Sequence, residues 1–344
     1  MSNDERIFVL IPSFNEDHLR LTVEGAIATA ANPEGLSFGI CQQSTTGEFE
    51  DFRNLKNVRV TNVFCDSPRG ADLARIMAGS LHDDEPYMLR LDAHHLFADD
   101  WDSVLLAKHK ALEAADPDTK PLITQYLPRY GLYDGQIRMI DEPGSARAPS
   151  MQMLGSRTDS FMLWMPMYLY GEPVAGDWHE HHCLSNHFIF SRSEFFWEIM
   201  PDPAIMFEGD EPCLALRAWT RGYRMYAIPE MIVWHRAKFP DIPKDDDDFL
   251  GQVAMLNGRL DTGDWRKVDE YANRMRRMSG KLRTEKILTG QHLGEWGAPG
   301  LNLLKRYYQA AKFDIQEFYE ESNRLHVEAY GYKFSEKANL IPRM

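Results

Sequence analysis

Short apolar runs alternate with segments of helical periodicity over the first hundred residues of this chain. Helical spacing extends over residues 19–31 and about 70–81. Around these segments lie apolar runs of the kind expected of strands covered on both faces. The candidate strands are residues 7–11, 37–42, 58–64 and 87–91. This β-α-β-β-α-β order predicts an α/β fold with a mainly parallel sheet.

Polar segments follow three of these candidate strands. They are residues 13–16 (Ser-Phe-Asn-Glu), 66–70 (Asp-Ser-Pro-Arg-Gly) and 92–94 (Asp-Ala-His). Ligands of such sheets bind beyond the carboxyl ends of the strands. We therefore expect all three segments at the ligand-binding edge of the sheet.

The segment Asp92-Ala93-His94 is the most informative of the three. Its carboxylate and its imidazole leave a buried strand toward one edge of the sheet. Carboxylate oxygen and neutral imidazole are a good ligand pair for a divalent ion such as Mn²⁺. Such an ion could hold the two phosphates of a nucleotide-sugar and neutralise charge as the diphosphate leaves. The alternative is a turn with two solvated polar side chains.

A group of acidic side chains precedes a predicted helix over residues 211–221. Glu208, Asp210 and Glu211 surround a glycine at this point. Helix capping explains one of them, because the helix dipole favours negative charge at the first turn. The alternative is an active-site role, in which the carboxylates accept hydrogen bonds from sugar hydroxyls and stabilise positive charge on a reacting anomeric carbon.

A histidine with two cations follows a short predicted strand at residues 232–234. His235 has Arg236 and Lys238 beside it. A histidine in such a position is usually structural or solvated. Here it is also a candidate third metal ligand, and the two cations are candidates for contacts to the leaving diphosphate.

Residues 179–182 (His-Glu-His-His) are also rich in groups that bind metals. They lack the His-Glu-x-x-His spacing, and no helical pattern surrounds them, so a zinc site is not favoured. A pocket wall or an acceptor-facing loop fits this segment better. Residues 185–187 (Ser-Asn-His), just after it, could reach a bound sugar.

The domain organisation follows from composition along the chain. Residues 128–177 contain many Gly, Pro, Met and aromatic residues and show little periodicity, so we expect an irregular, substrate-facing insertion. Residues 240–248, rich in Pro and Asp, are the best candidate boundary. We therefore predict a catalytic domain over residues 1–240, with an acceptor-side insertion over 128–182, and a mostly helical region over 249–344.

Charge and cysteine content limit the classes of partner. The 344 residues carry a formal net charge of −14, and the one basic cluster, residues 274–283, is typical of a solvated helix face. The four cysteines form no C-x-x-C pair and are expected to be buried in a reducing compartment. We see neither a signal peptide nor a membrane span, so we expect a cytoplasmic protein with no membrane partner. The sequence leaves the oligomeric state open.

Several segments together resemble a known family. Their order and spacing are similar to those of the polypeptide α-N-acetylglucosaminyltransferases, whose eukaryotic members modify hydroxyproline on a cytoplasmic ubiquitin-ligase adaptor. The segments are residues 38–43, 69–75, 85–94 with 100–102, 207–211, 216–223 with Pro229 and His235, and 293–300. The Asp-x-His motif and the late histidine also resemble the mucin-type polypeptide N-acetylgalactosaminyltransferases. The resemblance covers most of the chain.

This resemblance implies a glycosyltransferase-A fold, a UDP-sugar donor, Mn²⁺ or Mg²⁺ as cofactor, and retention of the anomeric configuration. The matched residues are Asp92, His94 and His235 as metal ligands, Asp210 and Glu211 at the sugar site, and Ser13, Arg69 and Arg75 as nucleotide contacts. The chain departs from the family at Ala93, where serine is usual, and residues 128–182 have no clear counterpart.

The sequence therefore predicts a metal-dependent, retaining glycosyltransferase. Its first-choice donor is UDP-N-acetylglucosamine, and its acceptor is a hydroxyl group that a polypeptide can supply. Two alternatives stay open. One is a non-catalytic nucleotide-sugar-binding module that kept the fold, and the other is a transferase acting on a modified nucleic-acid base or a glycan. The acidic charge argues against a nucleic-acid partner.

Overall fold

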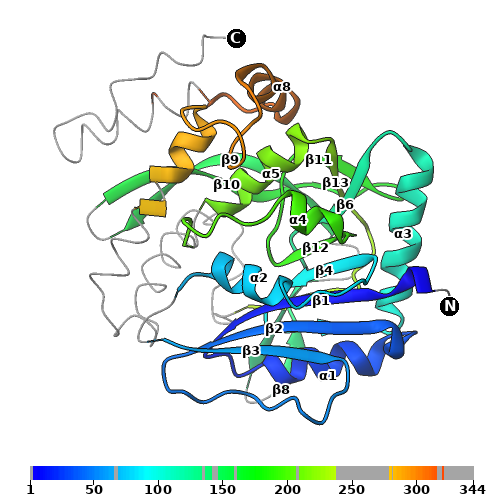
Figure 1. Ribbon diagram of the computed structural model, residues 1–344. Helices are drawn as coiled ribbons and strands as arrows, with labels where there is room; N and C mark the ends of the chain where they lie inside the picture. The colour runs from blue at the N-terminus through cyan, green and yellow to red at the C-terminus, as the bar shows by residue number, and fades with distance from the viewer. Residues whose placement is uncertain are drawn as a thin grey trace.

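An eight-stranded sheet forms the centre of the protein in this computed structural model (Figure 1). The structure describes residues 3–65, 69–133, 136–141, 146–158, 161–206, 209–237, 279–280, 282–315 and 320. In spatial order the strands are β11 (His179–His181), β13 (Tyr223–Ala227), β6 (Lys120–Thr124), β12 (Phe188–Arg192), β4 (Tyr87–Leu91), β1 (Ile7–Phe14), β2 (Leu36–Ser44) and β3 (Val58–Phe64). Only β11 and β12 run antiparallel to their neighbours, so the predicted α/β fold with a mainly parallel sheet is confirmed.

Helices cover both faces of this sheet, which explains why β1 and β4 are mostly apolar. The helices are α1 (Leu19–Thr29), α2 (Ala71–Gly79), α3 (Trp101–Ala115), α4 (Glu194–Glu198), α5 (Asp210–Thr220) and α8 (Leu301–Ala311), with short 3-10 turns at Asn3–Glu5 and Pro33–Gly35. Val9 and Leu89 pack in one core with α1 and α3, whereas Phe8 and Leu10 pack against α2 and α4 on the other face. Successive side chains of a strand point to opposite faces, so β1 contributes to both cores.

A second, four-stranded sheet carries residues to the edge where β4 ends. Its order is β5 (His95–Phe97), β14 (Val233–Arg236), β7 (Arg129–Tyr133) and β8 (Gln136–Met139). In the antiparallel pair of β14 and β5, His235 lies opposite His95. This register places His235 next to the turn that follows β4.

The prediction of an irregular segment over residues 128–177 is wrong. This region contains β7 and β8, followed by a long antiparallel hairpin of β9 (Arg147–Thr158) and β10 (Phe161–Pro173). The hairpin pairs with itself as a separate two-stranded sheet (Figure 1). The strands of a hairpin pair through their backbones, which requires no strict alternation of apolar and polar residues. The composition of residues 128–177 therefore gave little indication of the hairpin.

The described part of the C-terminal region contains helices joined by turns. Residues 282–288 and α8 are helices, and Ile287, Leu304 and Tyr307 lie in one hydrophobic core with Leu214 of α5. The candidate boundary at residues 240–248 lies outside the described residues, so the predicted division into two domains stays a prediction.

The prediction that the four cysteines are buried is confirmed. Cys41, Cys65, Cys183 and Cys213 are all buried, free thiols. Within the described ranges, none of the helices has both the length and the apolar character needed to cross a bilayer.

Candidate metal and sugar site

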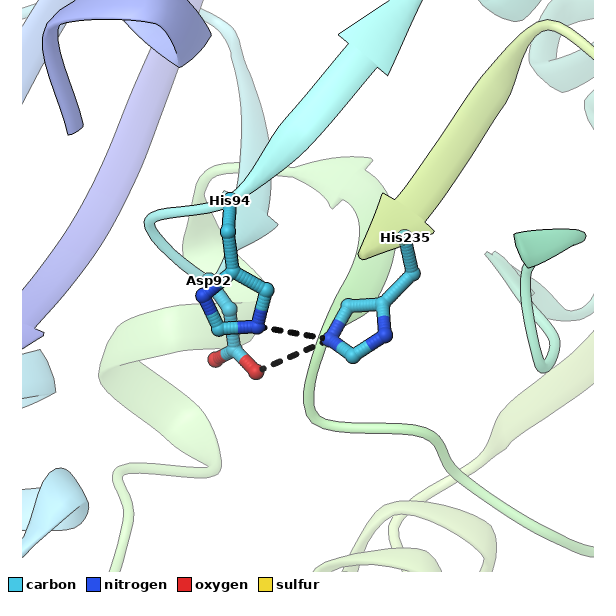
Figure 2. Close-up of side chains that lie close together, drawn as sticks. All are labelled: Asp92, His94 and His235. Carbon is cyan, nitrogen blue, oxygen red and sulfur yellow. Dashed lines mark hydrogen bonds and ion pairs between the residues drawn. The ribbon is translucent and has the colours of Figure 1, made fainter. Parts of the chain in front are cut away.

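Three side chains that are far apart in the sequence meet at the carboxyl end of β4. Asp92 directly follows β4, His94 lies in the turn before β5, and His235 comes from β14 (Figure 2). One ligand atom from each lies within 4.8 Å of the other two. The Nε2 atoms of His94 and His235 are 3.0 Å apart, and His235 Nε2 is 3.7 Å from Asp92 Oδ2.

This donor set suits a divalent transition-metal ion. One carboxylate oxygen and two imidazole nitrogens are ligands typical of Mn²⁺ and similar ions. Burial alone would raise the pKa of Asp92, but the contact with His235 and the charge of Arg75 outweigh it and hold that pKa well below its usual value. Asp92 is therefore ionised, as a metal ligand must be.

Two further histidines surround His235. The ring centroids of His187 and His95 lie 4.7 Å and 5.1 Å from that of His235. Burial, reinforced by the neighbouring His235, holds the pKa of both rings well below the usual value, so both are neutral. His95 and His187 therefore place two neutral imidazole rings next to the candidate ligand His235.

The acidic pair lies at the start of α5, close to the candidate ligands. Arg75 connects the two groups, because its Nη1 is 3.1 Å from Asp210 Oδ2 and its Nη2 is 3.4 Å from Asp92 Oδ1. Glu211 accepts hydrogen bonds from the backbone N–H of Asn186 at 2.8 Å and from the hydroxyl of Tyr126 at 3.2 Å. The arrangement therefore places two carboxylates beside a potential metal site.

Two glycines allow this close packing. Gly209, with φ of +91°, starts α5, and a Cβ there would lie 2.3 Å from Oγ1 of Thr284. Gly70, with φ of +96°, starts α2, and a Cβ there would lie 2.9 Å from the carbonyl oxygen of Met206. Both turns use a conformation that favours glycine. The segment around Arg75 thus packs directly against the segment before the acidic pair.

The family assignment rests on most of this sequence. The family described as Glycosyltransferase (GlcNAc) matches residues 46–277. The chain is a member of this glycosyltransferase family. No curated protein matches it.

Comparison with solved structures shows the fold of this chain. GalNAc-T7, crystallised with UDP, GalNAc and Mn²⁺, aligns at a TM-score of 0.52 and 17% identity, over 96% of this chain and 59% of that one. The chain thus spans less than two thirds of the length of GalNAc-T7 and shares its glycosyltransferase-A fold. TarS 1–349 from S. aureus, in complex with UDP, aligns at a TM-score of 0.43 and 13% identity, over 95% of this chain and 87% of that one. That score is too low to support a conclusion.

The residues expected to contact a nucleotide have different surroundings. Ser13 is buried near the end of β1, and Arg69 is exposed just before α2. Arg75 is 3% exposed, and both of its terminal nitrogens contact carboxylates of the chain itself. Arg236 pairs with Asp17 at 2.7 Å. Lys238 and Glu208 lie outside the described residues.

Two buried charged residues, Asp72 and Arg90, were not predicted from the sequence to lie near the site. Asp72 is fully buried and pairs with Arg75 at 2.8 Å. Arg90 is buried within β4 and donates a hydrogen bond of 2.6 Å to Oδ1 of Asn186, whose amide nitrogen donates to Asp210. The arginine inside the apolar run of residues 87–91 was the available signal, because a charge in a buried strand needs a partner.

The segment 179–182 takes no part in the metal cluster. His181 lies in β11, and its Nε2 is 2.8 Å from the carbonyl oxygen of Thr124. Among the residues that the structure describes, the group of Asp92, His94 and His235 is the one with metal-binding geometry. A zinc site at 179–182, which the sequence did not favour, gains no support.

Glu211 should make the stability of the protein depend on pH. Burial, followed by the charge of Asp210, raises the pKa of Glu211 to about 8 from its usual value of 4.5. Between pH 4.5 and 8 the folded state therefore keeps a proton on Glu211 that the unfolded state has lost. The free energy of unfolding falls as pH rises through that window. Relative to wild type, Glu211→Gln should become more stable as pH rises, by at most about 1.4 kcal/mol per pH unit.

Urea unfolding of the wild type and the variant at pH 5.5 and 7.5 measures this difference. Glu24→Gln, on the exposed surface of α1, serves as the matched control and should show a constant difference. A constant difference for Glu211→Gln as well would contradict the raised pKa.

Proposed function

We propose that this protein is a metal-dependent, retaining glycosyltransferase that transfers N-acetylglucosamine from UDP-N-acetylglucosamine to a hydroxyl group, with a polypeptide as the acceptor. The observation that carries the proposal is the meeting of two groups at one edge of the sheet. Asp92, His94 and His235 form the candidate metal group, and Asp210 and Glu211 form the candidate sugar group, with Arg75 in contact with both.

In this proposal Asp92, His94 and His235 hold Mn²⁺, or Mg²⁺ in its place. When bound, the ion supplies positive charge to the diphosphate and so favours its departure. UDP and Mn²⁺ are the nucleotide and the ion named for the GalNAc-T7 structure. We assign Arg236 and Lys238, which follow His235 in the chain, to contacts with the leaving diphosphate.

The nucleotide and sugar are assigned to the neighbouring residues. Ser13 and Arg69 lie where β1 ends and α2 begins, and we assign them to the nucleotide. We assign the buried side chains of Asp210 and Glu211 to hydrogen bonds with the sugar hydroxyls, and the charge of Asp210 to stabilisation of the positive charge that develops at the anomeric carbon.

Retention follows if the acceptor attacks from the side that the diphosphate leaves. The bond between the anomeric carbon and the phosphate oxygen breaks, and the acceptor oxygen forms the new bond. The acceptor proton passes to the departing phosphate oxygen. We assign the acceptor side to residues 128–182, the catalytic domain to residues 1–240 and a mostly helical extension to residues 249–344.

A donor screen tests the proposed function. UDP release is measured from UDP-N-acetylglucosamine, UDP-glucose, UDP-galactose and UDP-N-acetylgalactosamine, with Mn²⁺, with EDTA, and with Mn²⁺ restored after EDTA. We expect release to be fastest with UDP-N-acetylglucosamine, absent in EDTA and recovered with the ion. Nucleotide binding without release from any donor would instead support a non-catalytic module, and release in EDTA would contradict the metal site.

A further inference from the structure

Glu16 connects the loop after β1 to the candidate metal group. Its Oε2 lies 3.0 Å from Nδ1 of His94, on the side of the ring away from His235. Both side chains are largely buried, with exposed fractions of 14% for Glu16 and 6% for His94. Arg236 Nη1 lies 3.8 Å from Glu16 Oε1. Glu16 therefore lies between His94, a candidate ligand, and Arg236, which follows the candidate ligand His235.

This contact determines which nitrogen of His94 is free to bind a cation. An ionised carboxylate can only accept a hydrogen bond, so Nδ1 of His94 must carry the proton. In the neutral ring the lone pair is then on Nε2, the atom that lies 3.0 Å from Nε2 of His235. Carboxylates that accept the second N–H of a metal-bound histidine fix its tautomer and orientation and raise its basicity.

The backbone before Glu16 holds this carboxylate in place. Asn15 has a φ of +44°, a left-handed conformation that asparagine tolerates better than most residues. Its N–H donates to the carbonyl of Gln43 at 3.1 Å, and its side chain exchanges hydrogen bonds with Thr45. The end of β1 is therefore hydrogen-bonded to the end of β2, and the chain turns so that Glu16 points to His94.

We propose that Glu16 is the positioning residue of the metal site: it sets the tautomer and orientation of His94 so that Nε2 faces the cation. The inference rests on the proposed function, because it assumes that His94 is a ligand. It also connects the loop at the end of β1, where we place the nucleotide, to the cation.

Mn²⁺ binding to the metal-free chain of 344 residues tests this role without relying on turnover. Free Mn²⁺ is measured by electron paramagnetic resonance during titration of the wild type and four variants. Loss of an outer carboxylate typically weakens metal binding about 10–100-fold, and we expect this for Glu16→Ala. Glu16→Gln keeps an acceptor oxygen and should lose less. Raising Mn²⁺ to saturation should restore kcat in both variants, which a general defect in folding would not allow.

Asp17→Asn is the matched control, because it removes one negative charge from the adjacent residue. Asp17 pairs with the same Arg236 but is exposed, with 73% of its side chain accessible. It should leave Mn²⁺ affinity unchanged. Wild-type affinity in Glu16→Ala, or equal weakening in Asp17→Asn, would overturn the positioning role.

Asp92→Asn separates this inference from the proposed function. If Asp92→Asn loses Mn²⁺ binding and Glu16→Ala keeps it, the metal site stands and only the role of Glu16 fails. If the wild type binds no Mn²⁺, or Asp92→Asn binds it as the wild type does, the metal site fails and the role of Glu16 fails with it.

Discussion

Asp92→Asn should abolish sugar transfer and donor hydrolysis and weaken Mn²⁺ binding by more than about 100-fold. Asp92 is the one carboxylate in the candidate metal group, and it is held ionised by its contacts with His235 and Arg75. Residues that merely orient a metal ligand are worth about 10–100-fold in affinity, so removal of the charged ligand itself should cost more. Release of UDP and Mn²⁺ titration measure the two effects.

Asp99→Asn provides the control for this substitution. It makes the same chemical change seven residues later in the chain, at an exposed position. We expect wild-type activity and metal affinity there. Full activity of Asp92→Asn would remove the metal assignment and with it the proposed handling of the diphosphate.

Arg75→Met should destabilise the fold by about 3–5 kcal/mol, the usual cost of breaking a buried ion pair on one side. The guanidinium is 3% exposed and contacts Asp72, Asp210 and Asp92 at 2.8, 3.1 and 3.4 Å. Without it, two buried carboxylates lose their nearest cation. Burial and the charge of Asp210 already raise the pKa of Asp72 to about 8, so protonation of Asp72 absorbs part of the cost.

Urea unfolding at pH 7.5 measures this loss, with Arg53→Met as the matched control. Arg53 also pairs with an aspartate, but its side chain is 90% exposed, and surface pairs contribute about 0–1 kcal/mol. Asp72→Asn added to Arg75→Met should recover part of the stability, because an amide at this position needs neither a countercharge nor a bound proton. A loss below about 1 kcal/mol in Arg75→Met would contradict the network.

The sheet was predictable because its strands are covered on both faces. Apolar runs at β1 and β4 and helical spacing over α1 and α2 carry the signal that burial imposes on sequence. The hairpin of β9 and β10 pairs mainly with itself, and no comparable periodicity marks it.

The candidate site was only partly accessible from the sequence. Asp92 and His94 follow directly from the end of a buried strand. The position of His235 depends on the register of β14 against β5, which no local pattern specifies. The contact of Glu16 with His94 and the burial of Arg90 depend on tertiary packing, which places charges where composition alone would assign them to solvent.

A crystal structure with UDP and Mn²⁺, measured at a wavelength where manganese scatters anomalously, tests whether Asp92, His94 and His235 hold one ion. We expect one anomalous peak coordinated by these three residues, with the diphosphate of UDP on the same ion and Glu16 still bonded to His94. UDP bound with no peak there, or a peak held by other residues, would contradict this expectation.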